Sequence, residues 1–160
     1  MKLPAEEKAR LDKLCNQFRI DLIETLHQRQ TGHPGGSLSV CEILTTLYFE
    51  EMNVAPADPQ MADRDRLVLC KGHAAPMLYR VLAEKGFFPV DEMKTLRCLD
   101  SRLQGHPCPL ETPGVDAATG PLGIGLSAAL GMSMALKLNN SPARVYAILG
   151  DGEIEEGTVW

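Results

Sequence analysis

Hydrophobic residues recur at helical spacing in the first part of the chain. Over residues 5–30 the apolar positions fall three and four residues apart with charges between them, which predicts a long amphipathic helix. Residues 31–36 interrupt this pattern with glycines and a proline, so we expect a turn there. A second helix is predicted from Ser39, because Ser39 and Glu42 have the spacing of a capping box. Its expected buried stripe is Val40, Ile43, Leu44 and Leu47.

Two short apolar runs, at residues 66–70 and 144–149, predict buried strands. Further helices are predicted at residues 74–85, 91–99 and 123–138, and a long polar loop at 101–120. Strands separated by helices are typical of a parallel sheet, so the predicted class is α/β, helix-rich and with few strands. Since two parallel strands make an incomplete sheet, we expect residues 1–160 to form a partial domain.

Composition and charge narrow the classes of function. An apolar fraction of 44% and a charged fraction of 23% are typical of a soluble globular protein. The formal charge of −5, without a basic run, disfavours nucleic-acid binding. No apolar stretch has membrane-spanning length, and the charged start is unlike a signal peptide. The cysteines form no C-x-x-C pair, and Cys15, Cys41 and Cys70 lie in apolar patterns, so buried thiols in a reducing cytoplasm are expected.

Three of the four histidines, His33, His73 and His106, directly follow a glycine in a turn. One such histidine alone would more often be a solvated surface residue. Glycine, however, lets a backbone approach a ligand closely, and imidazoles suit proton transfer and the recognition of hydroxyl and phosphate groups. The three together therefore predict a binding site, whereas His27, inside the first helix, is expected to be structural.

Two further turns have the character of a ligand site. The glycine-rich residues 119–125 precede a helix, where free N–H groups favour an anion. Such turns mostly serve packing, and this one lacks the features of a P-loop or a dinucleotide fingerprint, which disfavours nucleotide binding. Asp151 follows the second strand, at the end where open α/β sheets bind ligands. One carboxylate alone cannot hold a divalent cation, and the nearby Glu155 and Glu156 alone would more often be a solvated pair.

Five motifs in this order resemble the thiamine-diphosphate-binding domain of transketolases. They are Thr-Gly-His-Pro-Gly-Gly-Ser at 31–37, Leu-Val-Leu-Cys-Lys-Gly-His-Ala at 67–74, Gln-Gly-His-Pro at 104–107, Thr-Gly-Pro-Leu-Gly-Ile-Gly at 119–125 and Gly-Asp-Gly-Glu-Ile-Glu-Glu-Gly at 150–157. The resemblance covers nearly the whole chain and implies an incomplete thiamine-diphosphate-binding α/β fold. The short spacers are most similar to the amino-terminal subunit of split, two-chain transketolases.

The resemblance implies roles for individual residues. His33 and His106 match histidines that face the sugar substrate and assist proton transfer, and His73 matches a contact to the cofactor diphosphate. Asp151 matches a ligand of Mg²⁺ (or Ca²⁺), and Gly152 matches a backbone amide that binds the diphosphate. The backbone that touches the aminopyrimidine ring matches Gly120, Pro121 and Leu122.

The implied reaction belongs to the pentose phosphate pathway and moves a two-carbon ketol unit from a ketose phosphate to an aldose phosphate. Glu156 matches a buried acid that links two active sites across a dimer interface, so the implied partners are a second copy of the chain and a carboxy-terminal subunit. In the family an asparagine and a backbone carbonyl, which would follow Trp160, complete the metal site. The glutamate that activates the aminopyrimidine lies in another domain. We therefore expect residues 1–160 alone to be inactive, to bind the cofactor weakly and to be poorly folded or self-associating.

Two alternatives remain. A deoxyxylulose-phosphate-synthase-like enzyme shares the cofactor and a Gly-His-x-Gly motif, but Pro34 and the stretch 71–74 favour transketolase. A truncated, non-catalytic paralogue that binds a partner is the other, and the retention of Asp151 and all three Gly-His turns argues against it.

Overall fold

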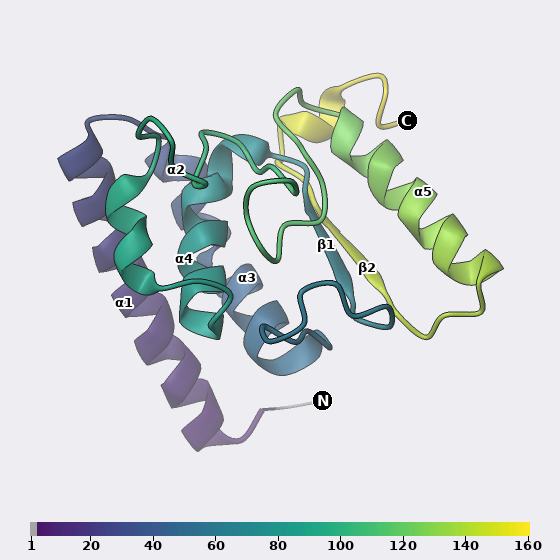
Figure 1. The fold of residues 1–160 in the computed structure, drawn as a ribbon, viewed down its shortest axis with the longest axis horizontal. Helices are drawn as coiled ribbons and strands as arrows, with labels where there is room; N and C mark the ends of the chain where they lie inside the picture. The colour runs from purple at the N-terminus through teal and green to yellow at the C-terminus, as the bar shows by residue number, and fades with distance from the viewer. Residues whose placement is uncertain (1–2) are drawn as a thin grey trace.

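The computed structural model describes residues 3–160 and places a two-stranded sheet between two layers of helices (Figure 1). Strand β1 (Arg66–Leu69) pairs in parallel with β2 (Val145–Ile148), so that Arg66 lies opposite Val145 and Leu69 opposite Ile148. The predicted α/β class with few strands is confirmed.

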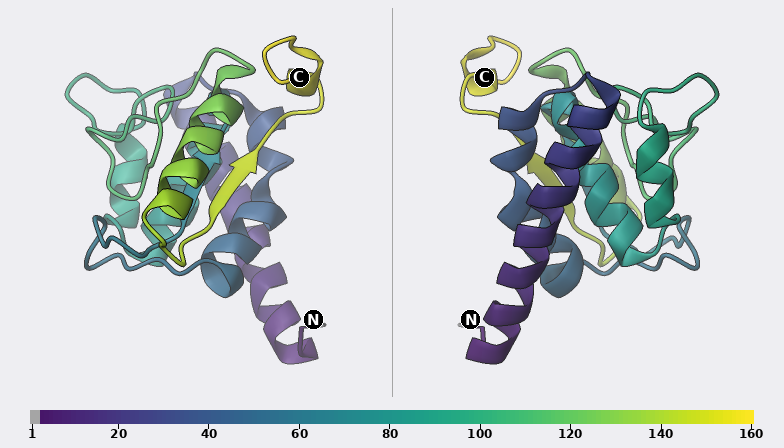
Figure 2. Two further views of the ribbon diagram at one scale, coloured as in Figure 1. Left: turned by 90° about the vertical axis from the view of Figure 1, so that its right-hand side faces the viewer. Right: turned by 90° about the vertical axis from the view of Figure 1, so that its left-hand side faces the viewer.

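The larger helical layer and the single helix α5 lie on opposite faces of the sheet (Figures 1 and 2). The larger layer contains α1 (Ala5–Arg29), α2 (Pro34–Leu38), α3 (Cys41–Thr46) with the π-helical turn η1 (Leu47–Glu51), and α4 (Ala75–Lys85). The other layer is α5 (Ile124–Leu138). Short 3₁₀ turns lie at η2 (Gly72–Ala74), η3 (Val90–Thr95) and η4 (Glu153–Glu155). Among residues 3–160, no helix is both long and apolar enough to cross a bilayer.

Alternate residues of β1 pack into the two layers, because successive side chains of a strand point to opposite faces. Leu67 and Leu69 join the main core, in which the fully buried Phe18, Tyr48 and Tyr79 are the largest side chains. The smaller core on the other face joins the sheet to α5 and is formed by Val68, Cys70 and Ala129. The sheet therefore has apolar contacts on both faces.

Two predicted helix boundaries are wrong. Helix α2 begins at Pro34, inside the expected turn, because proline is favoured at the first helical position, where its missing N–H is not needed. Ser39 is not an N-cap: its hydroxyl donates to the Gly36 carbonyl at 3.0 Å, and α3 begins at Cys41 without a side-chain cap. Ile43 is 50% exposed, so the predicted stripe of this helix is only partly buried.

The helix predicted over residues 91–99 is also wrong. The chain forms only η3 there, because Leu96 turns to an extended backbone (ψ 123°) and Arg97 adopts a left-handed conformation (φ 58°). The predicted helices at the start of the chain, before Gly86 and before Asn139 are confirmed as α1, α4 and α5.

Side chains from the long loop cover the outer edge of β1. The Leu67 N–H donates to the Asp116 carboxylate at 2.8 Å, and the Thr119 hydroxyl donates to the Leu69 carbonyl at 2.7 Å. Residues 67 and 69 direct these groups away from β2, because alternate residues of a strand bond to opposite neighbours. The side chains of Asp116 and Thr119 thus take the place of a neighbouring strand.

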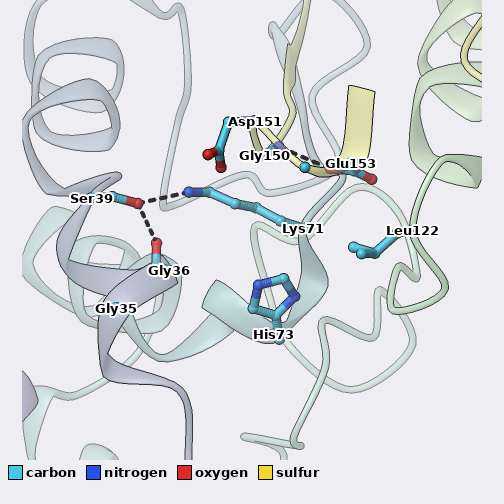
Figure 3. A pocket seen from close by; sticks show the side chains of 10 residues that line it. Gly35, Gly36, Ser39, Lys71, His73, Leu122, Gly150, Asp151 and Glu153 are labelled. Carbon is cyan, nitrogen blue, oxygen red and sulfur yellow. Dashed lines mark hydrogen bonds between the residues drawn. The ribbon is translucent and has the colours of Figure 1, made fainter. Parts of the chain in front are cut away.

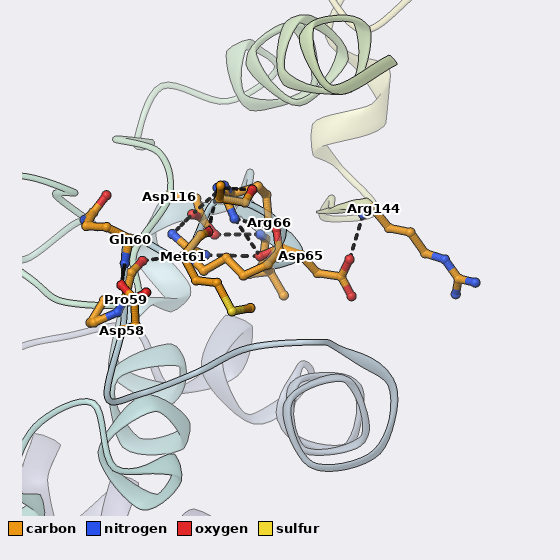
Figure 4. Close-up of polar contacts among 11 residues, drawn as sticks. Asp58, Pro59, Gln60, Met61, Asp65, Arg66, Asp116 and Arg144 are labelled. Atoms are coloured by element: carbon orange, nitrogen blue, oxygen red, sulfur yellow. Dashed lines mark hydrogen bonds and ion pairs between the residues drawn. The ribbon is translucent and has the colours of Figure 1, made fainter. Parts of the chain in front are cut away.

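A buried acid fixes where the two strands begin (Figure 4). The Asp65 carboxylate accepts hydrogen bonds from the Arg144 N–H at 2.6 Å and the Asn53 N–H at 2.9 Å. Beside it, the Arg64 guanidinium donates to Asp116 at 2.5 Å. These contacts hold β1, β2 and the long loop in register, so that both strands end at the same level.

Candidate functional site

A cleft of about 450 Å³ lies at the carboxyl ends of both strands (Figure 3). It is lined by Gly35, Gly36, Ser39, Lys71, His73, Leu122, Gly150, Asp151, Gly152 and Glu153. The turns that follow β1 and β2 converge here, because parallel strands end on the same side of a sheet. Four of the predicted site residues, His73, Leu122, Asp151 and Gly152, line this cleft.

The three Gly-His turns also meet at this end of the molecule. The rings of His33 and His73 lie edge to face, with centroids 5.3 Å apart. A Cβ added at Gly120 would lie 3.3 Å from the His106 ring, and one added at Gly36 would lie 3.2 Å from the His73 ring. A side chain at either position would press on an imidazole ring, because both rings pack directly against the glycine backbone.

Lys71 reaches across the cleft from the end of β1 (Figure 3). Its Nζ donates to the Ser39 hydroxyl at 2.8 Å. Burial lowers the pKa of Lys71, whereas the negative charges of Asp151 and Glu153 raise it. The sequence predicted no role in a binding site for Lys71, which directly precedes one of the Gly-His pairs, and predicted only a helix cap for Ser39.

The environment of His73 favours its neutral form. Burial lowers the pKa of His73, and the positive charges of His33 and Lys71 lower it further. A neutral imidazole beside a lysine can donate one hydrogen bond to an anion and keep its other nitrogen as an acceptor.

Glu153 is a buried acid that sequence reasoning missed. Its side chain is 2% exposed, and its two oxygens accept hydrogen bonds from the Gly123 N–H and the Gly150 N–H, both at 3.0 Å. The carboxylate thereby joins the turn before α5 to the turn that carries Asp151. The sequence did contain a signal for this role. Glu153 directly follows Asp151-Gly152, in a glycine-rich turn whose backbone N–H groups need acceptors.

The remaining predicted residues lie around the rim. Pro121 and Glu156 are exposed, and Gly120 is half-buried under His106. Glu156 borders Gly123, where an added Cβ would lie 2.9 Å from the Glu156 Cβ. Its expected role in an interface between two copies stays a prediction.

Among the described residues that line the cleft, Asp151 is the one exposed acid, since Glu153 is buried and bonded to two backbone N–H groups. Asp151 is exposed and directs its carboxylate toward the cleft (Figure 3). Among the described residues, no group of three or more His, Cys, Asp or Glu side chains could hold a metal ion. Since hard divalent cations require about six oxygen ligands, the described residues supply one corner of such a site.

Comparison with known proteins gives a consistent assignment. Residues 11–160 match the family described as transketolase, thiamine diphosphate binding domain. The chain is 43% identical over 156 residues to the 6-deoxy-6-sulfo-D-fructose transketolase subunit SqwG of Clostridium sp. (strain MSTE9). The aligned region covers 98% of this chain and 57% of that protein. The chain is 42% identical over 150 residues to one of the subunits of the apulose-4-phosphate transketolase of Phocaeicola vulgatus, covering 94% of this chain and 53% of that protein.

A solved structure agrees with these relatives. Transketolase from Campylobacter jejuni is similar with a TM-score of 0.88 and 32% identity, over 99% of this chain and 25% of that one. The chain spans about half the length of the two subunits that it matches. Because the family match extends over nearly all of the sequence and the fold is shared, the chain belongs to the thiamine-diphosphate-binding domain family of the transketolases.

Proposed function

We propose that this chain forms the diphosphate-binding part of a transketolase active site. Together with a carboxy-terminal subunit, it transfers a two-carbon ketol unit from a ketose phosphate to an aldose phosphate. The observation that carries this proposal is the cleft beyond the ends of β1 and β2, which His73, Lys71 and Asp151 line together, with the ring of His33 against that of His73.

The charge and the donors of the cleft fit a diphosphate group. Lys71 supplies a positive charge, Gly152 supplies a backbone amide, and neutral His73 supplies a ring N–H. The backbone of residues 120–122 is the proposed contact for the aminopyrimidine ring. Thiamine diphosphate, when bound, supplies the carbanion chemistry that amino-acid side chains cannot.

Asp151 is the proposed ligand for Mg²⁺ (or Ca²⁺). Its carboxylate lines the same cleft as Lys71, so a cation held there would lie near the diphosphate position. The remaining oxygen ligands would come from the diphosphate, from water and from residues other than those described.

The histidines are the proposed contacts for the sugar. His33 and His106 would donate hydrogen bonds to substrate hydroxyl groups and exchange a proton with them. The proposal is supported by two contacts, because the His33 ring lies against the ring of His73 and the His106 ring lies against Gly120, and His73 and Gly120 are proposed cofactor contacts.

The proposed partners are a second copy of this chain and a carboxy-terminal subunit. Support comes from the names of two relatives, which are subunits, and from the unpaired apolar side chains on the outer face of α5. These are Leu130, Met134 and Leu138, which are 57–82% exposed. The five cysteines are all free, which supports a reducing, cytoplasmic location.

The test is an assay of the native protein with its partner, identified by native mass spectrometry. We expect ketol transfer from xylulose 5-phosphate to ribose 5-phosphate, and no condensation of pyruvate with glyceraldehyde 3-phosphate. Because two relatives are named for 6-deoxy-6-sulfo-D-fructose and apulose 4-phosphate, both compounds belong in the panel of donors. His106→Ala should lower kcat at least tenfold, whereas His27→Ala, an exposed histidine of α1, should not. Pyruvate turnover, or no turnover of any ketose, would refute the proposal.

A further inference from the structure

Arg97 lies between two of the histidine-bearing turns, on a loop to which the sequence assigned no function. Its Nη1 donates to the Thr31 hydroxyl at 2.9 Å, and its Nη2 donates to the Gly105 carbonyl at 3.3 Å. Thr31 is two residues before His33, and Gly105 is next to His106. One planar guanidinium therefore joins the turns that carry both proposed substrate histidines.

The backbone of Arg97 is held in an uncommon conformation. Its φ of 58° lies in the left-handed region, which is unfavourable for a side chain of this size. The conformation is fixed by a hydrogen bond from the Arg97 N–H to the Leu103 carbonyl at 2.8 Å. This backbone conformation directs the guanidinium toward Thr31 and Gly105.

Gly105 and Tyr79 complete the support. A Cβ added at Gly105 would lie 3.1 Å from the Arg97 Nε, so the guanidinium lies flat against this glycine. From helix α4, the Tyr79 hydroxyl lies within hydrogen-bonding distance of the carbonyls of Gln104 and His106, at 3.0 and 3.1 Å. The His106 turn is therefore held from two sides, and only the Arg97 contact also reaches Thr31.

We propose that Arg97 is a positioning residue for ketol transfer, which sets the separation of His33 and His106 by joining their turns. This proposal rests on the proposed function for its catalytic consequence. Arginine suits the task because its rigid fork fixes two acceptors at once, whereas lysine offers a single point of attachment. The Nε–H is buried and has no acceptor among the described residues, so the two Nη contacts carry the whole connection.

The test compares Arg97→Lys and Thr31→Val with the control Arg29→Lys in the native, partner-bound protein. Arg29 donates its Nε–H to the Leu96 carbonyl at 3.1 Å, and among the described residues its side chain makes no hydrogen bond to either turn, so its variant reports a purely structural loss nearby. We expect Arg97→Lys to lower kcat about 10- to 100-fold, since a displacement of about 1 Å at reacting groups has effects of this size. The KM for the donor should change less than threefold, and Arg29→Lys should retain wild-type kcat.

A second measurement does not depend on turnover. With selectively labelled histidine, cross-relaxation between the His33 and His73 rings should weaken in Arg97→Lys and in Thr31→Val, and the His106 signal should shift in Arg97→Lys. Arg29→Lys should leave these signals unchanged. If Arg97→Lys fails to fold, Thr31→Val carries the test, because it removes one acceptor and keeps the arginine.

The two measurements separate the two proposals. A wild-type protein without ketol transfer refutes the proposed function, while the histidine signals still decide whether Arg97 joins the turns. Unchanged signals, or changed signals with kcat within twofold of wild type, overturn the positioning role.

Discussion

The Glu153 carboxylate shows how a single buried side chain can hold two distant turns. One of its oxygens accepts the N–H of Gly123, and the other accepts the N–H of Gly150. Hydrogen bonds to a charged group are stronger than those between neutral groups. The position of Asp151 therefore depends on a neighbour that need not touch the ligand.

Glu153→Gln should lower the free energy of unfolding by about 1.5–3 kcal/mol, because an amide can accept only one of the two N–H groups and turns its own N–H toward the other. Urea denaturation of the variant measures the change. Glu155→Gln, an exposed neighbour, is the matched control and should have little effect. Equal stability of the two variants would show that the Glu153 contacts contribute nothing net.

His73 should make stability depend on pH. Burial and the nearby His33 and Lys71 lower its pKa in the folded protein, whereas an unfolded histidine takes up a proton near pH 6.5. Below about pH 6.5 the unfolded chain therefore binds more protons at this residue, and the stability that neutral His73 contributes is lost as the pH falls through its folded pKa. His73→Gln should give a shallower loss of unfolding free energy between about pH 7 and pH 5. Parallel curves for wild type and variant would contradict this.

At this scale the sequence predicted residues that their own type and their neighbours in the chain make conspicuous. His33, His73 and His106 each follow a glycine in the sequence, but the rings of His73 and His106 pack against other glycines, Gly36 and Gly120, and adjacent letters do not show that pairing. Glu153 and Arg97 were missed, since one partner of each, the Gly123 N–H and the Thr31 hydroxyl, lies in a turn far away in the chain. Spacing identifies a turn, but only the folded chain shows which distant turn lies beside it.

At the scale of elements, helix α5 is fitted to the sheet through a glycine. A Cβ added at Gly125 would lie 2.8 Å from the Cα of Cys70, so the first turn of α5 packs against the end of β1. The same helix contains Gly131, around which a Cβ would meet nothing within 4 Å. A methyl group added at Gly125 would therefore collide with β1, whereas one added at Gly131 would meet open space.

Gly125→Ala should destabilise the protein by about 1–3 kcal/mol through overpacking. Gly131→Ala should stabilise it by up to about 1 kcal/mol, because alanine has the higher helix propensity. Thermal denaturation of both variants shows directly whether each substitution stabilises or destabilises the protein. A stabilised Gly125→Ala protein would mean that the helix can move away from β1 at no cost.

Helix boundaries were predicted less well than helix existence. The capping-box pattern at Ser39 is present in the sequence, yet Ser39 bonds to Gly36 and Lys71 instead, because a helix already begins at Pro34. Tertiary contacts therefore redirected a side chain that local rules assigned to a cap. Helices α1 and α4 agree with prediction, since the periodic buried face of α1 and the nearly complete burial of α4 fix these helices independently of their ends.

For the molecule as a whole, the cleft has the donors for a diphosphate but one acid for a cation. We expect a polypeptide limited to residues 1–160 to bind thiamine diphosphate at least about 100-fold more weakly than the native assembly, a difference of about 2.7 kcal/mol. Titration calorimetry with Mg²⁺ measures both affinities, and a circular-dichroism melt shows whether the short polypeptide is folded. Tight, Mg²⁺-dependent binding to residues 1–160 would contradict this expectation.

The two edges of the sheet differ, because loop side chains cover the outer edge of β1 but no strand covers the outer edge of β2 among residues 3–160. Asp116 accepts the outward-facing Leu67 N–H, and Thr119 donates to the outward-facing Leu69 carbonyl, whereas among residues 3–160 no further strand pairs with β2. A unit with one open edge can only pair with another open edge and then stops, while a unit with two open edges polymerises without limit. The side chains of Asp116 and Thr119 thus block the addition of a further strand beside β1, so that strand pairing beyond the two described strands is left to β2.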